Sequence, residues 1–363
     1  MNTPRKTPVL ALVVPFYNEE RYLPRLFDSL RTQSVEDIPV VFIDNASTDS
    51  SAALVQQCEE VQTGQWTCLE QRQVGKFSAM WTGTAFCVER LGVRYVGFLD
   101  ADSYCADSNW VSNGARIVED ANCQFGYTYS PIAYCGFEHL PTFMTAYRAY
   151  EQVLRFVVEQ VGWLANGLGF VCAAEVLMRY FQSAQITTEI DLRCSLLALS
   201  EGRQAYCNST LLMTSGRRIT VNARNFAAWC FYERAFYTQK DINARVKLDL
   251  NASANVEDLR PDMIGQFFQR RAVKVTCRHL IPLAIFDRSS LALERIKAVL
   301  GIDVTKQLDP LVKRFRGDPD FLLTDRFETM IRAIECHPAS AALSNRIADL
   351  MRKQRDGVAP HGT

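Results

Sequence analysis

The chain has 363 residues, with 40 Lys or Arg and 40 Asp or Glu, so its formal net charge at pH 7 is zero. A balanced charge gives no overall field that would attract nucleic acid or an anionic membrane, so we expect no nucleic-acid partner and look for function in local sites. The 12 cysteines form no Cys-x-x-Cys pair, which argues against a zinc module and predicts a reduced, cytoplasmic protein.

The first half of the chain alternates predicted strands with predicted helices. Residues 9–16 form a first apolar run, and the apolar positions from Tyr22 to Leu30 follow helical spacing. A second strand over Pro39–Ile43 precedes a helix from about Ser50 to Glu60, and Ser and Asp in the connecting loop are suited to cap that helix. A third strand, Trp66–Glu70, leads to a helix that is preceded by Gly75 and Lys76.

The fourth predicted strand ends in two carboxylates. Val96, Phe98 and Leu99 form an apolar run, and Asp100 and Asp102 follow it directly. Side chains two residues apart on extended backbone point the same way, so both carboxylates can face one hard cation or one sugar-phosphate group. A turn or helix cap is the alternative reading of this pattern. The alternation as a whole predicts an α/β fold with a mostly parallel, doubly wound sheet whose loops gather at one edge.

The pattern changes after residue 107. We expect a strand over Phe125–Tyr129 and a long helix over Pro141–Val161, whose aromatic stripe either faces the core or lies on a membrane. Gly167, Gly169 and Phe170 are expected to open a segment that a ligand can approach closely. From about residue 220 the chain is predicted to be mostly helical, with a basic, aromatic stretch from Phe267 to His279.

Several short motifs occur together in a fixed order. They are VVPFYNEE, IDNASTDSS, Gly75-Lys76, FLDADS, TEIDL and TSGRR, over about residues 8–220. In order and rough spacing the set resembles family 2 glycosyltransferases with the GT-A nucleotide-diphospho-sugar transferase fold. The resemblance implies a GT-A domain over residues 1–220, with a nucleotide-sugar half at about 8–107 and an acceptor half at about 108–220. Residues 221–363 would then be a mostly helical C-terminal region.

The resemblance also implies roles for individual residues. Asp102 would be the metal ligand, with Asp100 beside it and nearer the ribose, and the cation would be Mn²⁺ or Mg²⁺. The nucleotide would be held by residues from five segments: Pro15, Tyr17, Glu19, Asp44, Asn45, Lys76, Asp100, Arg217 and Arg218. Arginine forks suit phosphate oxygens, although a solvated basic turn remains the alternative for Arg217 and Arg218.

An inverting transfer needs a base for the acceptor hydroxyl. Aligning Asp191-Leu192 with the family's downstream Asp-Leu puts Glu189 at the base position, whereas many relatives carry an aspartate there. Asp191 is the alternative base, and it is also suited to a helix N-terminus.

The resemblance therefore implies an inverting, metal-dependent glycosyltransferase that moves a sugar from a nucleoside-diphosphate sugar to a hydroxyl acceptor. Two alternatives stay open: a catalytically degenerate nucleotide-sugar-binding protein, and a nucleotidyltransferase on a similar fold. The latter is expected to have a glycine-rich phosphate loop after its first strand, which PFYNEE is not. No stretch is long and apolar enough to span a bilayer, so any membrane contact would be peripheral, through the helix from Pro141 and the segment from Phe267 to His279.

Overall fold

The fold was analysed in a computed structural model of the chain. It describes residues 8–35, 37–73, 75–120, 132–136, 138, 140–161, 169–183, 190, 193, 194, 197, 211–217, 261–277, 294, 297, 298, 301, 308, 310, 321, 322 and 324–356.

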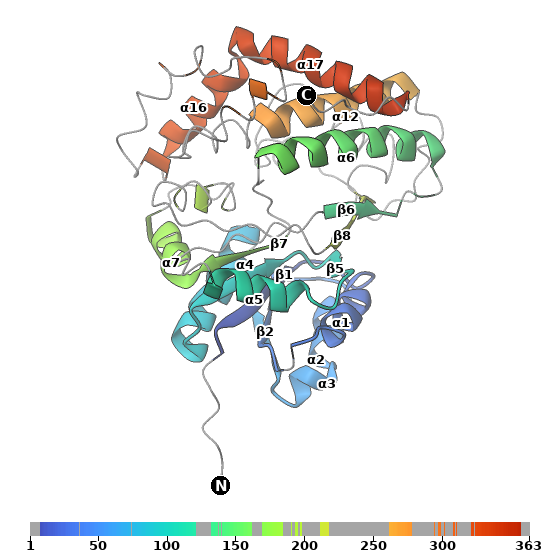
Figure 1. Ribbon diagram of the computed structural model, residues 1–363. Coiled ribbons are helices and arrows are strands. Elements are labelled where there is room, and N and C mark those ends of the chain that lie inside the picture. The colour runs from blue at the N-terminus through green and yellow to red at the C-terminus, as the bar shows by residue number, and fades with distance from the viewer. Residues whose placement is uncertain are drawn as a thin grey trace. The chain divides into compact units, whose positions relative to one another are not determined.

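A five-stranded sheet, in the order β3-β2-β1-β4-β7, organises the first half of the chain (Figure 1). Four of its strands are parallel, and β7 pairs antiparallel with β4 along the edge. Its strands are β1 (Leu10–Phe16), β2 (Val40–Asp44), β3 (Trp66–Glu70), β4 (Tyr95–Leu99) and β7 (Gly169–Ala173). The predicted α/β class and the four leading strands are therefore confirmed, each within a residue or two of its expected bounds.

Helices lie between these strands in sequence, and one more follows β7. They are α1 (Leu23–Arg31), α2 (Ser51–Gln56), α3 (Glu59–Gln62), α4 (Lys76–Phe86) with the π-helical turn η1 (Cys87–Leu91), α5 (Trp110–Asp120) and α7 (Ala174–Ser183). The single helix expected from Ser50 to Glu60 is wrong, because Cys58 has an extended backbone (φ −64°, ψ 134°) that separates α2 from α3.

Both faces of the sheet are buried, because β1 is apolar at consecutive positions. Leu12 and Val14 pack in one core cluster with Leu26 of α1. The other face is covered by α4, where Gly83 lies so close to the sheet that an added Cβ would be 2.4 Å from a methyl carbon of Val13. Side chains from both sides thus fix the sheet in a doubly wound arrangement.

The segment expected to admit a ligand at Gly169 and Phe170 is instead a buried edge strand. Phe170 is fully buried and stacks 4.9 Å from Phe98 between ring centroids. A Cβ at Gly169 would lie 2.6 Å from a methyl carbon of Leu212, so this glycine serves close packing. A second, three-stranded sheet has the order β5-β8-β6, with β5 at Ser103–Cys105, β8 at Leu212–Ser215 and β6 at Ile132–Cys135. Gly167 and the strand expected at Phe125–Tyr129 lie outside the described residues.

The chain divides into two compact units. The first comprises Met1–Ala133 and Ala165–Thr214, and the second Tyr134–Leu164 and Ser215–Thr363. The predicted boundary at residue 220 differs from this division, because the long helix from Pro141 groups with the C-terminal helices.

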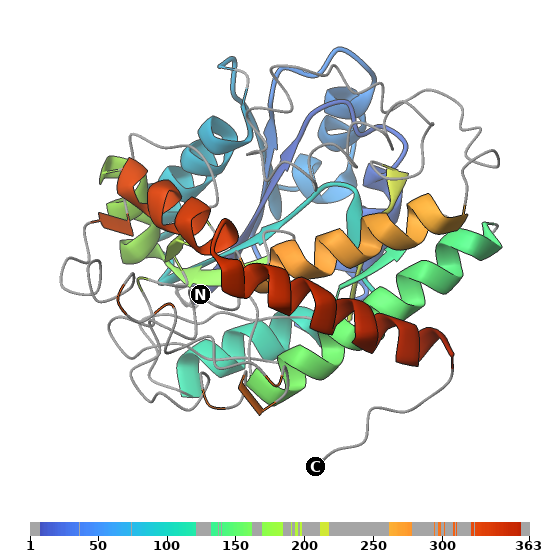
Figure 2. The ribbon, with the colours of Figure 1, turned by 90° about the horizontal axis from the view of Figure 1, so that it is seen from above.

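The second unit is built on helices that pack on one another (Figure 2). These helices are α6 (Pro141–Val161), α12 (Pro261–Val275) and α17 (Pro338–Arg355), and α16 (Asp325–Glu335) directly precedes α17 in the chain. The aromatic stripe of α6 is core-facing, since Tyr147 and Tyr150 are buried and pack on Phe268 of α12 at 5.9 and 5.6 Å between ring centroids. These aromatic rings are therefore not available to a membrane surface.

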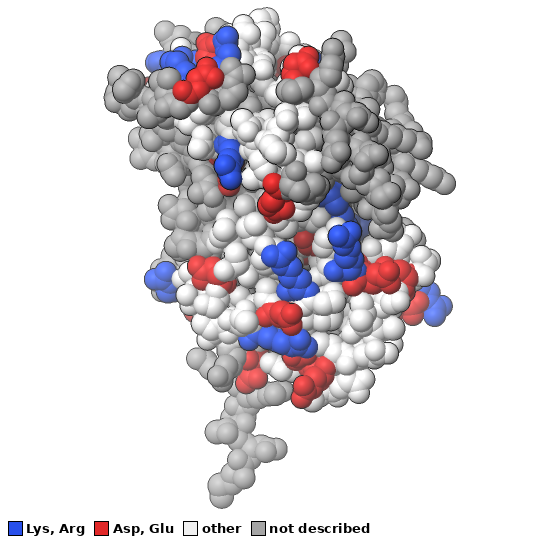
Figure 3. Space-filling view, turned by 90° about the vertical axis from the view of Figure 1, so that its right-hand side faces the viewer, with Lys and Arg blue, Asp and Glu red and all other residues white. Residues whose placement is uncertain are grey.

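The described residues contain no membrane-spanning helix. No helix there is long and apolar enough to cross a bilayer. On the face in Figure 3, acidic and basic side chains lie interspersed, in agreement with the zero net charge of the chain.

Candidate active site at the carboxyl edge of the sheet

The carboxyl ends of β1, β2 and β4 meet at one edge of the sheet, because these strands are parallel and in register. β2 ends at Asp44, and Asn45 follows it; both are buried at 9% and 6% exposure. β4 ends at Leu99, so Asp100 begins the turn at the same edge. Open α/β sheets bind their ligands at this edge. The predicted nucleotide-binding residues Asp44, Asn45 and Asp100 lie at the ends of these strands.

The loops after β1 and β2 are joined by hydrogen bonds between their side chains and backbone. The Asn18 side chain accepts a bond from Thr48 N (2.8 Å), and Asn18 N donates to Ser47 Oγ (3.1 Å). Glu19 N donates to Ser51 Oγ (2.7 Å). Asn18 has a positive φ of 54°, which asparagine tolerates better than most residues. These bonds hold Tyr17, which is 48% exposed, at the rim of the edge.

A second chain of contacts runs across the strand ends to α4. Asn45 N donates to Phe16 O (2.9 Å), and Asn45 Oδ1 accepts a bond from Gly75 N (3.1 Å). Gly75 has φ 146°, a conformation that glycine adopts readily. Lys76 follows as the first residue of α4, and its Nζ lies 2.5 Å from Asp100 Oδ1. Main-chain contacts thus position Lys76 so that its ammonium reaches Asp100.

The turn that carries Asp100 and Asp102 is compact. Ser103 N donates to Asp100 O (2.9 Å), and β5 then pairs Ser103 with Thr214 of β8. Asp102 is 9% exposed. No group of three or more His, Cys, Asp or Glu side chains suited to a metal occurs in the described part of the chain. Asp100 and Asp102 therefore lie in a turn and not on extended backbone, and their carboxylate oxygens are of the kind that a hard cation prefers.

Not every predicted site residue can be placed. Glu189, Asp191 and Arg218 lie outside the described residues. Arg217 belongs to the second unit, where it is buried and its backbone N donates to Ser215 Oγ (3.3 Å). Pro15 lies in β1 next to the edge, and Glu19 follows Asn18 in the first loop.

The joining role of Asn18, Thr48 and Ser51 was not predicted from the sequence. The sequence feature that could have indicated it is a run of Asn, Ser and Thr in both loops, because these residues form hydrogen bonds with nearby backbone. Pattern alone does not show that two loops 30 residues apart are partners. Asp49, expected to cap α2, does bond to the first residue of that helix, accepting from Ser51 N at 2.9 Å.

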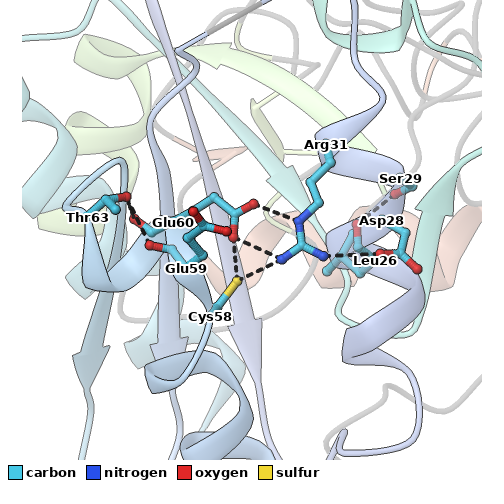
Figure 4. Close-up of polar contacts among 8 residues, drawn as sticks. All are labelled: Leu26, Asp28, Ser29, Arg31, Cys58, Glu59, Glu60 and Thr63. Carbon is cyan, nitrogen blue, oxygen red and sulfur yellow. Dashed lines mark hydrogen bonds and ion pairs between the residues drawn. The ribbon is translucent and has the colours of Figure 1, made fainter.

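The amino edge of the same sheet carries a different polar cluster (Figure 4). Arg31 of α1 donates through Nε and Nη2 to the two carboxylate oxygens of Glu60, at 2.6 and 3.0 Å. Nη1 donates to Asp28 Oδ1 (3.2 Å), and Cys58 Sγ donates to Glu60 Oε2 (2.7 Å). The Arg31 hydrogen bonds lower the pKa of Glu60 to about 2. A cavity of about 350 Å³ lies beside this cluster, lined among others by Leu12, Gln33 and Trp66. Because each nitrogen of the Arg31 guanidinium already donates to a partner, the cluster is suited to joining α1 to α3.

Comparison with known proteins supports the reading of the carboxyl edge. Residues 11–161 match the family model "Glycosyl transferase family 2". The chain is 30% identical to glycosyltransferase GlyA of Streptococcus pneumoniae over 122 residues, which are 33% of this chain and 17% of GlyA. It is 24% identical over 241 residues to TuaG of Bacillus subtilis, a glycosyltransferase assigned to teichuronic acid biosynthesis, covering 65% of this chain and 88% of TuaG.

Among solved structures, a mannosyltransferase from Pyrobaculum calidifontis in complex with GDP-Man and Mn²⁺ covers 94% of this chain and 87% of its own, at 16% identity and a TM-score of 0.47. At this score the likeness adds nothing to the assignment. The matched residues 11–161 contain four strands of the central sheet and its carboxyl edge. Over residues 11–161, which are less than half of the chain, the sequence is thus similar to glycosyl transferase family 2.

Proposed function

We propose that the chain is an inverting, metal-dependent glycosyltransferase that moves a sugar from a nucleoside-diphosphate sugar to a hydroxyl acceptor. The observation that carries this proposal is the set of contacts at the carboxyl edge. Asn45, Gly75, Lys76 and Asp100 come from three separate loops, and the bonds Gly75 N to Asn45 Oδ1 and Lys76 Nζ to Asp100 Oδ1 join those loops in one place.

The nucleotide would occupy the loops after β1 and β2. Asp44 and Asn45 are buried at the strand end, and their carboxylate and amide oxygens can accept bonds from a nucleobase or ribose. Pro15, Tyr17 and Glu19 would shape the same pocket from the β1 side. Tyr17 is exposed, so its ring is available to stack on a base.

Asp102 and Asp100 would hold the divalent cation. When bound, Mn²⁺ or Mg²⁺ neutralises the diphosphate as it leaves. Lys76 adds a positive charge at the same place, and the arginines predicted to contact the diphosphate, Arg217 and Arg218, would add more.

The reaction is a single displacement in which Glu189, or alternatively Asp191, takes the proton of the acceptor hydroxyl. The acceptor oxygen forms a bond to the anomeric carbon as the bond from that carbon to the diphosphate oxygen breaks, and the configuration inverts. The nucleoside diphosphate leaves with the electron pair of the broken bond. The assignment of TuaG to teichuronic acid biosynthesis favours a glycan as acceptor.

A thermal-shift screen tests the donor site. Purified protein would be heated with UDP, GDP, dTDP and CDP sugars, with Mn²⁺ or with EDTA, because a ligand of the folded state raises its melting temperature. We expect one nucleotide to raise the melting temperature in a Mn²⁺-dependent way, and Asp102→Ala to remove the effect. Binding without release of nucleoside diphosphate, in the presence of glycan acceptors, would favour the degenerate binding protein instead. A shift that is equal with EDTA would contradict the metal dependence.

A further inference from the structure

Lys76 and Asp100 form an ion pair inside the candidate donor site. The Lys76 Nζ lies 2.5 Å from Asp100 Oδ1, and their side chains are 51% and 13% exposed. The carboxylate that the resemblance places beside the cation is therefore already in contact with a positive charge of the protein.

The Asp100 side chain is more restricted in its conformation than the Lys76 side chain. Asp100 is the first residue of a turn whose backbone accepts a bond from Ser103 N, and its side chain is mostly buried. The backbone at Lys76 is fixed through Gly75 N and Asn45 Oδ1, but its four-carbon side chain is half exposed and can take other rotamers. The ammonium can thus leave Asp100 without any change in the backbone.

The Lys76 ammonium at Asp100 affects the affinity of this site for a divalent metal ion. No group of three or more His, Cys, Asp or Glu side chains suited to a metal occurs among the described residues, so a cation at Asp100 and Asp102 would need further ligands. Two carboxylates are a weak site for Mn²⁺ or Mg²⁺ in the absence of phosphate oxygens. An ammonium on one of them weakens the site further, because it must be displaced or must stay close to the incoming divalent charge.

We propose that Lys76 is a resident counter-cation that makes metal binding depend on the nucleotide. Without nucleotide, the ammonium neutralises Asp100 and keeps the metal affinity low. When the nucleoside diphosphate binds, the ammonium moves to its phosphate oxygens, and Asp100 becomes available for the metal that the diphosphate also coordinates. This inference rests on the proposed function, because it requires that the edge binds a nucleoside diphosphate.

Direct titration of Mn²⁺ tests the inference without any measurement of transfer. Free Mn²⁺ would be followed by its electron paramagnetic resonance signal, with protein alone and with saturating UDP or GDP. In Lys76→Met, which removes the charge and keeps an apolar side chain, we expect Mn²⁺ alone to bind about 3- to 10-fold more tightly than in the wild type. The gain in Mn²⁺ affinity that the nucleotide causes should shrink by a similar factor.

Two control variants isolate the contact. Lys76→Arg keeps the positive charge and should keep the strong dependence on nucleotide. Arg72→Met removes a positive charge that pairs with Glu70 at 3.2 Å and is 88% exposed, and it should leave Mn²⁺ binding unchanged. An equal gain in Arg72→Met would show a general effect of net charge and overturn the role of Lys76.

The outcomes separate the inference from the proposed function. If wild type and Lys76→Met bind Mn²⁺ alone with the same affinity while both bind it with a nucleotide, the donor site stands and the counter-cation role is refuted. If neither binds Mn²⁺ with UDP or GDP, and none of the four nucleotides raises the melting temperature, the donor site itself is refuted and the inference falls with it.

Discussion

Each of the two edges of the central sheet carries a basic side chain that contacts carboxylates, Arg31 at one edge and Lys76 at the other. The contacts of these two side chains differ in kind. At the amino edge, Arg31 spans both oxygens of Glu60 and also reaches Asp28, so its planar fork has no donor nitrogen left over for a ligand. At the carboxyl edge, Lys76 makes a single contact with Asp100 from a flexible side chain. The first arrangement is suited to holding two helices together, and the second to exchanging one partner for another.

The pairs Arg31–Glu60 and Lys76–Asp100 also differ in whether predicted site residues surround them. Glu60 and Cys58 belong to the loop and short helix after α2, and none of the residues drawn in Figure 4 is a predicted site residue. Asp100 lies one residue from Ala101 and two from Asp102, in the turn where a strand of the sheet ends. Four predictions test this contrast, beginning with the largest expected effect.

Loss of Asp102 should affect chemistry far more than stability. Asp102→Ala removes one of the two carboxylates of the proposed cation site, and we expect transfer to fall by at least about 100-fold. Urea unfolding should show a much smaller change, because the residue lies in a turn. Near-normal transfer by a folded variant, with its own donor and acceptor, would remove Asp102 from the site.

Loosening the joined loops should weaken donor binding. Asn18→Ala removes the acceptor for Thr48 N and places alanine at a positive φ, so we expect the KM for the donor to rise about 5- to 10-fold with little change in kcat. Asn18→Asp keeps the acceptor oxygen and should restore most of the affinity. An unchanged KM in Asn18→Ala would mean that the joined loops do not shape the nucleotide pocket.

Loss of Arg31 should lower the stability of the fold and leave donor binding unchanged. Arg31→Met leaves Glu60 and Asp28 without their cation, and we expect the free energy of unfolding to fall by about 1 kcal/mol, since the pair is partly exposed. Donor affinity should be unchanged, as measured by isothermal titration. A loss of donor affinity without a loss of stability would make the amino edge part of the site.

The smallest expected effect is the pH dependence of the amino-edge pair. The folded pKa of Glu60 is lowered from 4.5 to about 2, so its contribution to stability is present above pH 4.5 and is lost as the pH falls toward 2. The difference in unfolding free energy between wild type and Arg31→Met should therefore shrink by less than about 1 kcal/mol between pH 6 and pH 3. Urea unfolding at both values checks this, and a difference that grows on acidification would contradict the assignment.

The sheet was predictable from the sequence because its signal is local. Apolar runs such as Val96–Leu99, each followed by polar residues and a helical pattern, are typical of parallel strands, and the structure has strands at these positions. The edge strand β7 was missed, since Gly169 and Phe170 look like an open loop until Leu99 is placed beside them. The grouping of α6 with α12 likewise depends on packing between segments more than 100 residues apart.

The candidate site could be proposed from the sequence as a set of residues, but its contacts could not. Asp44, Asn45, Lys76 and Asp100 could be named from motifs, because each motif follows a strand or begins a helix. The ion pair of Lys76 with Asp100 and the bond from Thr48 N to Asn18 join residues 24 and 30 positions apart, so sequence spacing carries no information about them.

Equilibrium binding of the nucleoside diphosphate to three proteins tests the central claim most directly. Wild type, Asp102→Ala and Arg31→Met would be titrated in the same buffer with Mn²⁺, using the nucleotide selected by the thermal-shift screen. The carboxyl edge as donor site predicts that Asp102→Ala loses most of the affinity and that Arg31→Met keeps it. Retention of full affinity by Asp102→Ala, together with its loss in Arg31→Met, would place the nucleotide at the opposite edge of the sheet and contradict the account.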